Sequence, residues 1–456
     1  MKKIYLNEIL SNLGIALKNR DAIIKRVKPD IKKLGDNTLI FHLSKDEEIN
    51  QEDFKKYKDC YIITDQPILK DFLKKDKYIF VENINKVYKD FINYYRNLFN
   101  PIVIAITGTC GKTTTKEMIV QVLKNNYNVV NTICSKNNLK FNHDYLMKFN
   151  DSTEYGVFET AITHPGHLIL DCEIYKPQIG IITNIGIDHL NWCKTMNNYI
   201  RTKAEMLVGL KNRGHLIINN DDDNIRKIDF SMYKGSIITF GTNNLSDYYG
   251  KDINYSRDKI FFNLVLKQKE YKVRVPGNGI HNVYNALAAL ACLNTVGMGI
   301  NDAIFYLEKY IPIRSHTEVK TGINKSTVID DSWSSNPTSM SAALDVLSNL
   351  GKSKQKIAII GKISYLGKYK KIYYKMIAKE IVNKGIDILI TIDDDAKEIG
   401  DYALSLGMSS SNVFQVNKKE ELKNLLNATL TEKSVVLFKT SMIDKNAQEI
   451  MREVIP

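Results

Sequence analysis

The sequence contains no pair of cysteines in the C-x-x-C arrangement and no zinc-finger spacing. A chain of this size in a reducing compartment keeps its thiols free, so neither a disulfide scaffold nor a structural zinc site is expected. The cysteines are Cys60, Cys110, Cys134, Cys172, Cys193 and Cys292.

Long apolar runs are also missing. No window approaches 18 consecutive apolar residues, so the sequence predicts no transmembrane helix and no membrane insertion. The N-terminus begins with a basic MKK but lacks the apolar stretch and the small-residue cleavage site of a signal peptide. We therefore expect a cytoplasmic protein. No internal repeat and no long linker rich in Pro, Gly or Ser divides the chain.

Acidic residues are in the minority, and the formal charge is 64 − 51 = +13. Most of the excess is lysine. It indicates either attraction of anionic substrates such as nucleotides or simply a solvated lysine-rich surface. No basic stripe with interleaved aromatic residues stands out, so nucleic acid is not an expected partner. With 456 residues, 44% hydrophobic and 25% charged, the chain can form two or three domains, each with its own core.

Apolar runs and amphipathic segments alternate along the chain. Up to about residue 100, the strand-like runs NTLIFHL, CYIITD and KYIFVE mix with Lys-rich helical segments. EYGVFET, QIGIITNIG, GHLIINN and GSIITFG follow as buried-strand patterns, then a hairpin pattern IFFNLVLKQKEYKVRV and a helix NVYNALAALACLNTVG. From residue 313 strict strand–helix alternation predicts a doubly wound parallel sheet. We predict a three-domain α/β protein with domains 1–100, 101–312 and 313–456.

Residues 102–115 are the most informative segment. The apolar run IVIAI leads into TGTCGKTTT, and the amphipathic pattern KEMIVQVLKNNY follows at once. Strand, Gly-rich loop and helix in this order predict a phosphate-binding loop in which backbone N–H groups and the helix N-terminus hold the phosphates. Lys112 would reach the β- and γ-phosphates, and Thr113 would face Mg²⁺, with Thr114 as the fallback if the register is shifted by one. The nucleotide-binding residues predicted here are Gly108, Thr109, Gly111, Lys112, Thr113 and Thr114.

Further segments follow in a defined order: Glu159 at the end of an apolar run, ITNIGIDHL, TKAEML, INNDD, GIHNVYNALAA and IDDSWSSNPTSMSAAL. With GTCGKTTT, this series resembles the Mur ligases, ATP-dependent amide-forming enzymes of peptidoglycan synthesis. The pattern DDSxxxNPxSMxAAL, with THPGHL and TKAEML, is most similar to the member that adds D-alanyl-D-alanine to UDP-muramoyl-tripeptide. The resemblance implies that ATP activates a carboxylate as an acyl phosphate. An amine then attacks, giving an amide, ADP and phosphate. Under this resemblance the N-terminal domain would recognise substrate, the central domain would bind ATP and the C-terminal domain would be Rossmann-like.

The resemblance also implies a metal site with two Mg²⁺ ions, which would neutralise charge as a carboxylate attacks a triphosphate. Thr113 and Glu159 are expected to bind the first Mg²⁺, since both offer hard oxygen ligands. His189 would help to bind the second. Lys203, at the TKAE position, would be carbamylated and so become an anion; otherwise it is an exposed helical lysine. Lys112, His189, Lys203 and Asp331 are the expected catalytic residues.

Several polar residues are candidates for the rest of the nucleotide. Asn282 and Asn285 lie one helical turn apart on one face, and their amides suit the edges of adenine. Arg314 stands where the family carries an arginine that reaches ATP across the domain gap, although its local pattern RSHTE differs. Asp331 would approach the phosphates or Lys112, and its neighbour Asp330 is the alternative.

The substrate positions depart from the resembling family member. The uridine-binding Asp-Ser-Arg triplet is missing from KRVKPDIKKLGDNTLIF. The substrate segment NNLKFNH keeps Asn137 and Asn138 but has Phe141 and His143 at the usual Gly and Pro positions. The family's GDM-x-ELG is GKISYLG, its YNANP is WSSNP and its KGSR is KTSM. The expected substrate residues are Asn137, Asn138, Asn336 and Lys439.

These departures leave several functions open. The main hypothesis is a monomeric peptidoglycan ligase that acts on two small molecules, a carboxylate acceptor and an amine donor. An amide ligase of a specialised pathway would keep the ATP site and change the substrates. A phosphate-loop NTPase or kinase, or a non-catalytic nucleotide-binding protein, would keep only part of the site.

Overall fold

The computed structural model describes residues 1–44, 46, 52, 54, 56–66, 77–137, 139–162, 164–256, 258–441 and 449–452. Contacts within the chain form two compact units. The first consists of Met1–Val103, Tyr127–Gly156 and Glu173–Lys176, and the second of Ile104–Asn126, Val157–Cys172 and the chain from Pro177 onward. Residues 127–156 therefore fold with the N-terminal region, although they follow the phosphate-loop helix in the sequence.

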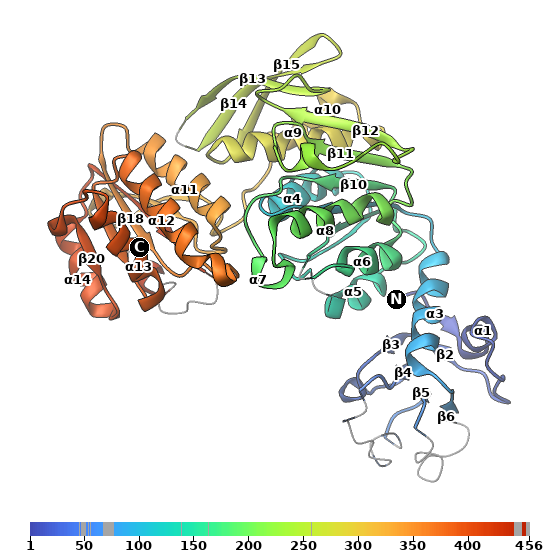
Figure 1. The fold of residues 1–456 in the computed structure, drawn as a ribbon. Helices are drawn as coiled ribbons and strands as arrows, with labels where there is room; N and C mark the ends of the chain where they lie inside the picture. The colour runs from blue at the N-terminus through green and yellow to red at the C-terminus, as the bar shows by residue number, and fades with distance from the viewer. Residues whose placement is uncertain are drawn as a thin grey trace. The chain divides into compact units, whose positions relative to one another are not determined.

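The N-terminal region is a small α/β fold (Figure 1). Its four-stranded sheet has the order β3-β4-β5-β6, and every pair of neighbours is parallel. The three predicted strands are confirmed as β4, β5 and β6. The elements are β1 (Ile4–Tyr5), α1 (Leu6–Asn12), β2 (Ile23–Ile24), β3 (Arg26–Lys28), β4 (Thr38–Phe41), β5 (Cys60–Thr64), β6 (Tyr78–Phe80) and α3 (Ile84–Asn97).

A nine-stranded sheet forms the centre of the chain, in the order β15-β14-β13-β12-β11-β10-β7-β9-β8. Strand β10 pairs in parallel with both β7 and β11, and their apolar side chains are buried, as expected for strands covered on both faces. The strands are β7 (Ile102–Thr107), β8 (Val129–Asn131), β9 (Tyr155–Glu159), β10 (Ile179–Ile182), β11 (His215–Asn219), β12 (Ser236–Gly241), β13 (Tyr248–Tyr255), β14 (Lys259–Leu266) and β15 (Lys269–Pro276). The helices are α4 (Lys112–Leu123), α5 (Leu139–Leu146), α6 (His167–Tyr175), α7 (Leu190–Cys193), α8 (Met196–Gly209), α9 (Ile280–Thr295) and α10 (Ile300–Leu307).

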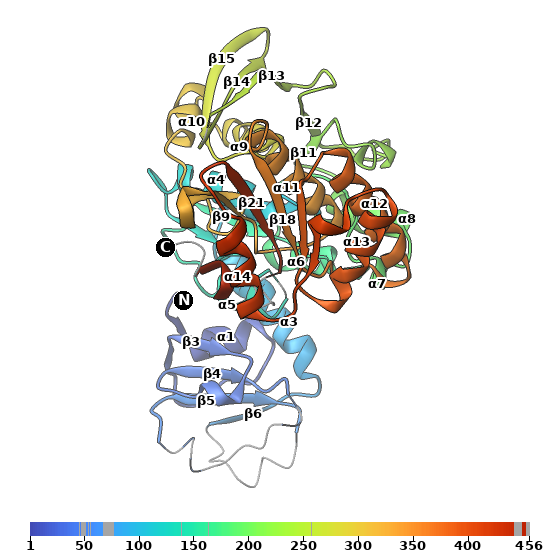
Figure 2. The same cartoon turned by 90° about the vertical axis from the view of Figure 1, so that its left-hand side faces the viewer.

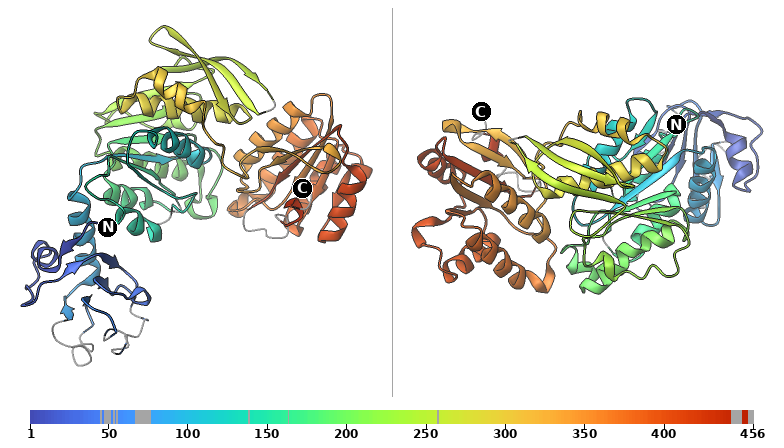
Figure 3. Two further views of the ribbon diagram at one scale, coloured as in Figure 1. Left: turned by 180° about the vertical axis from the view of Figure 1, so that it is seen from behind. Right: turned by 90° about the horizontal axis from the view of Figure 1, so that it is seen from above.

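The predicted hairpin is confirmed: β14 and β15 pair in antiparallel register from Lys259–Pro276 to Leu266–Lys269. Figure 3 shows β13, β14 and β15 in yellow-green beside α9 and α10 in yellow. Helix α9 is the predicted Ala- and Leu-rich helix, and it is buried from Ala286 to Leu293 because it packs on both α4 and the sheet.

The C-terminal region is the predicted doubly wound sheet, with the order β16-β17-β21-β18-β19-β20. All pairs are parallel except β16–β17. One apolar core joins α11, α12 and α13 to the sheet, and a second core joins α14 to its other face (Figure 2). The elements are β16 (Glu318–Thr321), β17 (Thr327–Asp330), α11 (Pro337–Leu350), β18 (Gln355–Ile360), α12 (Lys370–Asn383), β19 (Ile388–Thr391), α13 (Asp394–Ser405), β20 (Val413–Gln415), α14 (Lys419–Thr429) and β21 (Ser434–Lys439).

The last predicted helix, DKNAQEIMREVI, lies mostly outside the described residues, of which 449–452 are helical. No helix among the residues that the structure describes is long and apolar enough to cross a membrane.

Candidate functional site

The loop between β7 and α4 has the backbone geometry that a phosphate-binding loop requires. Gly108 has φ 149° and Gly111 has φ 80°, a region that side chains with a Cβ rarely adopt. A Cβ at Gly108 would clash with the side chain of Thr183, and a Cβ at Gly111 would clash with Asn285. Both glycines are therefore needed for conformation and for space, and α4 begins directly after them at Lys112.

The segment that follows β10 forms hydrogen bonds with this loop. Thr183 Oγ1 and Asn184 Nδ2 donate to the Cys110 carbonyl at 2.6 and 2.9 Å. Asn184 Oδ1 accepts the Cys110 N–H at 3.0 Å, and the Gly186 N–H donates to Thr109 Oγ1 at 2.9 Å. Thr183 and Asn184 were not predicted as site residues. They stand in the ITNIGIDHL segment, whose position after a strand was the available indication.

The predicted metal-binding oxygens of the loop are adjacent. Thr113 Oγ1 donates to Glu159 Oε2 at 2.8 Å, and both side chains are buried. A hydroxyl and a carboxylate at the start of the phosphate-loop helix match the hard oxygen ligands that Mg²⁺ prefers. No group of three or more His, Cys, Asp or Glu side chains in the described part of the chain could hold a metal by itself. A bound Mg²⁺ would therefore take its other ligands from phosphate oxygens and water.

Two lysines face the phosphate loop. Lys112 Nζ donates to the carbonyls of Gly108 and Thr109, both at 2.9 Å. Lys203, on α8, is 1% exposed, and its Nζ donates to the Gly108 carbonyl at 2.9 Å and to Thr107 Oγ1 at 3.3 Å. Burial, and next the charge of Lys112, hold the pKa of Lys203 well below its usual value. Burial therefore shifts the amine toward its neutral form, and Lys203 is not the exposed surface lysine of the alternative interpretation.

His189 lies beside these lysines. It has φ 51° and immediately precedes α7. Its ring stacks on Tyr365 at 5.2 Å, and its Nε2 lies 3.9 Å from Asp188 Oδ2. Its Nδ1 is buried without a hydrogen-bond partner among the described residues. Burial lowers the pKa of His189, and the positive charges of Lys203 and Lys112 contribute to the same shift. A neutral imidazole with an unused nitrogen fits a metal ligand.

Of the two predicted adenine residues, Asn285 lies against the phosphate loop and Asn282 is bonded to it. Asn285 Nδ2 donates to Asn282 Oδ1 at 3.1 Å, and Asn282 Nδ2 donates to the Asn278 carbonyl at 2.8 Å. Asn285 Oδ1 accepts from Thr115 Oγ1 at 3.3 Å. The pair thus supports α4 from α9, and its role toward adenine stays a prediction.

Three other predicted residues meet at the start of α11. Lys439 Nζ donates to Asp331 Oδ2 at 2.7 Å and to the Ser334 carbonyl at 2.6 Å, and its side chain is only 1% exposed. Asn336 caps α11 and donates from Nδ2 to Asp188 Oδ2 at 3.2 Å. Lys439 is therefore a buried partner of Asp331 and of the loop before α11. Contact of Asp331 with the phosphates, and of Lys439 and Asn336 with substrate, stays a prediction. Asp330, the alternative, accepts from Ser332 Oγ at 2.8 Å.

The remaining predicted residues are Arg314, Asn137 and Asn138. The side chain of Arg314 is exposed and forms no ion pair with any described residue. Asn137 belongs to the first unit, whereas Lys112 and its neighbours belong to the second. Asn138 lies outside the described residues.

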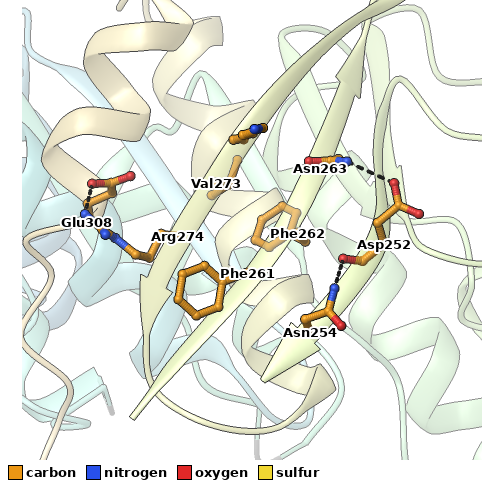
Figure 4. A pocket seen from close by; sticks show the side chains of 9 residues that line it. Asp252, Asn254, Phe261, Phe262, Asn263, Val273, Arg274 and Glu308 are labelled. Carbon is orange, nitrogen blue, oxygen red and sulfur yellow. Dashed lines mark hydrogen bonds and ion pairs between the residues drawn. The ribbon is translucent and has the colours of Figure 1, made fainter. Parts of the chain in front are cut away.

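A surface pocket lies elsewhere in the second unit, on the antiparallel strands (Figure 4). Arg274 pairs with Glu308 at 2.9 Å on one side, and Asn263 donates to Asp252 at 2.9 Å on the other. None of its residues belongs to the phosphate loop. They are Asp252, Asn254, Phe261, Phe262, Asn263, Lys272, Val273, Arg274 and Glu308.

Comparison with known families gives two matches. The family described as "Mur ligase middle domain" matches residues 106–293, and "Mur ligase, glutamate ligase domain" matches residues 317–442. The UDP-N-acetylmuramoyl-tripeptide–D-alanyl-D-alanine ligase of Buchnera aphidicola subsp. Baizongia pistaciae is 31% identical over 80% of this chain and 78% of its own length. The enzyme of the same name from Bacillus subtilis is 28% identical over 77% of this chain and 76% of its own.

Solved structures agree on the fold. MurF from Acinetobacter baumannii superposes with a TM-score of 0.86 at 22% identity, covering 100% of this chain and 99% of its own. MurF ligase from Thermotoga maritima in complex with ADP gives a TM-score of 0.81 at 20% identity, covering 94% of this chain and 96% of its own. At these identities the likeness concerns the fold alone. It supports the predicted three-domain α/β class, whose boundaries stay a prediction.

Proposed function

The chain belongs to the Mur ligase family of ATP-dependent enzymes that form carbon–nitrogen bonds, and from this premise we propose that it joins D-alanyl-D-alanine to a UDP-muramoyl-tripeptide in peptidoglycan synthesis. The observation that carries the proposal is the arrangement around the phosphate loop, where Lys112, the Thr113–Glu159 pair and the buried Lys203 lie together. The names of the relatives supply the substrate class.

The reaction takes place in two steps. A carboxylate oxygen of the acceptor attacks the γ-phosphorus of ATP, so an acyl phosphate forms and ADP leaves. The amine nitrogen of the dipeptide then attacks the acyl carbon; the C–N bond forms, phosphate leaves with the former carboxylate oxygen, and the amine loses a proton. Bound Mg²⁺ supplies charge neutralisation for the triphosphate.

The residues of this chain bind and orient the reactants. The loop N–H groups and the Lys112 ammonium hold the phosphates, because both place positive charge where negative charge is transferred. Thr113 and Glu159 would hold the first Mg²⁺ through oxygen atoms, and His189 Nδ1 is available for a second. The Thr113–Glu159 pair fits the ion by chemistry, since both side chains offer hard oxygen atoms.

We infer that Lys203 acts as a carbamate. Burial shifts the amine toward the deprotonated form, which is the form that attacks CO₂; an N–C bond forms, a proton leaves, and an anion results. An ammonium group beside the second Mg²⁺ would repel it, whereas a carbamate would provide an oxygen ligand. We further infer that the enzyme acts as a monomer in the cytoplasm, where its nucleotide-linked acceptor would be dissolved.

The test is release of ADP and phosphate from ATP by the purified protein. The proposal expects release to require both UDP-muramoyl-tripeptide and D-alanyl-D-alanine, with an amide product whose mass equals the sum of the two less water. Release without any acceptor acid would indicate an NTPase and contradict the proposal.

A second candidate is an amide ligase with other substrates. The missing Asp-Ser-Arg triplet and the burial of Lys439, which was expected to contact substrate, favour it. The same assay distinguishes the two when other carboxylic acids and amines replace the muramoyl and dipeptide substrates.

A further inference from the structure

His143 stands where the substrate segment of the resembling family member usually has Pro, and both of its ring nitrogens are bonded. Nε2 lies 3.0 Å from the Val27 carbonyl on β3, and Nδ1 lies 2.7 Å from the Tyr88 hydroxyl on α3. The side chain is 6% exposed. All these residues belong to the first unit.

The protonation state of His143 follows from these contacts. Burial lowers its pKa to about 4, so the ring is neutral near pH 7. A carbonyl can only accept, so Nε2 carries the proton and donates to Val27, and Nδ1 accepts from Tyr88. Lys28, on β3, also forms an ion pair with Asp144, on α5; the distance between Nζ and Oδ1 is 2.9 Å. Helix α5 is thus attached to β3 and α3 by two hydrogen bonds and an ion pair.

Helix α5 also forms hydrogen bonds with the residues that precede it in the sequence, which we call the acceptor loop (residues 132–137). The Tyr145 hydroxyl accepts the Ile133 N–H at 3.2 Å and donates to the Lys136 carbonyl at 3.0 Å. Lys136 N–H returns to the Ile133 carbonyl at 3.1 Å, and Asn137 N–H bonds to the Ser135 carbonyl at 2.9 Å. The loop that ends at Asn137 is therefore anchored on α5, and α5 is anchored on the N-terminal sheet.

We propose that His143 is a positioning residue for the acceptor substrate: by joining α5 to β3 and α3, it sets the acceptor loop and Asn137 relative to the N-terminal domain. The proposal rests on the proposed function, and it takes Asn137, one of the expected substrate residues, to contact the acceptor acid. β3 also lies in the segment KRVKPDIKKLGDNTLIF, where the resembling family member carries its uridine-binding triplet. His143 therefore joins the substrate segment to that N-terminal segment.

The test is steady-state kinetics with each of the three substrates varied in turn. His143→Leu removes both hydrogen bonds and leaves Tyr88 and Val27 with unsatisfied polar groups. KM for UDP-muramoyl-tripeptide should rise about tenfold, the size expected for the loss of one to two hydrogen bonds. KM for ATP and kcat should change less than about twofold, because the phosphate loop is not touched. His143→Gln, whose amide can donate and accept, should recover part of the loss.

Two further variants keep the result interpretable. Tyr88→Phe removes only one of the bonds and should raise the same KM about threefold, so it carries the test if His143→Leu does not fold. His42→Leu is the matched control: His42 is also a buried histidine of the first unit, bonded to Thr64 Oγ1 at 3.2 Å. An equal KM increase in His42→Leu and His143→Leu, or none in His143→Leu, overturns the proposal.

Hydrogen exchange separates this inference from the proposed function. Amides of the acceptor loop should exchange faster in His143→Leu than in wild type, while those of α4 should not change. If the wild-type enzyme does not use the muramoyl substrate, the proposed function is contradicted but the role of His143 is not. Hydrogen exchange in the acceptor loop would then test the role of His143 by itself. Unchanged exchange in the acceptor loop overturns the role of His143 even in an active enzyme.

Discussion

The phosphate loop and the acceptor loop are held in different ways. Residues 108–111 are held by backbone geometry and by the segment after β10, through short bonds from Thr183 and Asn184. The acceptor loop is held by side chains of α5, Tyr145 toward the loop and His143 toward the N-terminal sheet. The phosphate loop therefore depends on its own backbone conformation, whereas the acceptor loop depends on side chains of a neighbouring helix.

Lys112→Ala tests the role of the phosphate loop and has the largest expected effect. The variant should lose at least about a thousandfold in kcat, because one preorganised positive group at the transferred phosphoryl is removed. Initial-rate assays of ADP release measure it. Lys124→Ala, exposed at the other end of α4, is the control and should stay near wild type. Substantial activity in folded Lys112→Ala would mean that the loop does not hold the phosphates.

Lys203→Ala tests whether an anion is formed from the buried amine. It should lower turnover several hundredfold, by the loss of charge stabilisation at a metal site, and leave ATP affinity largely intact. Short carboxylic acids should restore part of the activity, since they can return a negative oxygen ligand to the vacated space. Bicarbonate should stimulate CO₂-depleted wild type but not the variant. A fully active Lys203→Ala enzyme would show that the site needs a different ligand.

Lys439→Met tests whether this buried lysine positions a loop or contacts substrate. Breaking a buried ion pair leaves Asp331 uncompensated and should cost about 3 kcal/mol of stability. We expect kcat to fall about tenfold, because the loop before α11 carries Asn336 toward Asp188. KM for the dipeptide should change little. A large rise in that KM with kcat unchanged would instead assign Lys439 to substrate binding.

Lys320→Met is the matched control for that variant. Lys320 pairs with Asp330 at 3.2 Å and with Glu318 at 3.0 Å, and its own side chain is 28% exposed whereas that of Asp330 is 1% exposed. Water can partly replace this lysine, so its loss should cost less stability than the loss of Lys439 and leave kcat unchanged.

The pH dependence of stability tests whether His143, which anchors the helix of the acceptor loop, is neutral in the folded protein. Its expected effect is the smallest. The pKa of His143 falls from an unfolded value of 6.5 to about 4, mainly by burial; the hydrogen bond to Val27 and the charge of Asp144 oppose the shift, and Lys28 and Lys33 add to it. The neutral form is therefore stabilising above pH 6.5, and that contribution is lost as the pH falls toward 4. Wild type should lose about 2 kcal/mol more than His143→Gln between pH 7 and pH 5. Thermal melts at both pH values measure the difference; parallel melts would contradict a neutral buried His143.

The sequence was sufficient where local chemistry determines structure. The phosphate loop was predicted because glycine, lysine and threonine between a strand and a helix have few other arrangements. The C-terminal sheet was predicted because its strands are continuous apolar runs between amphipathic helices. The pairing of Thr113 with Glu159 was expected from the family resemblance, and the structure places Thr113 Oγ1 2.8 Å from Glu159 Oε2.

Long-range pairings could not be predicted. The partners Lys439 and Asp331 are 108 positions apart, and His143 and Val27 are 116 apart. No local pattern distinguishes a buried lysine from a substrate-binding one. The grouping of residues 127–156 with the N-terminal region likewise depends on tertiary packing rather than on any break in composition.

Transfer of oxygen tests the central claim, ATP-driven ligation through an acyl phosphate, most directly. The acceptor carboxylate is labelled with ¹⁸O, and the phosphate released during ligation is analysed by mass spectrometry. Attack of the carboxylate on the γ-phosphorus predicts one ¹⁸O atom in each phosphate that accompanies a new amide bond. Phosphate without label, at the same yield of ADP, would mean that water attacked ATP and would contradict the account.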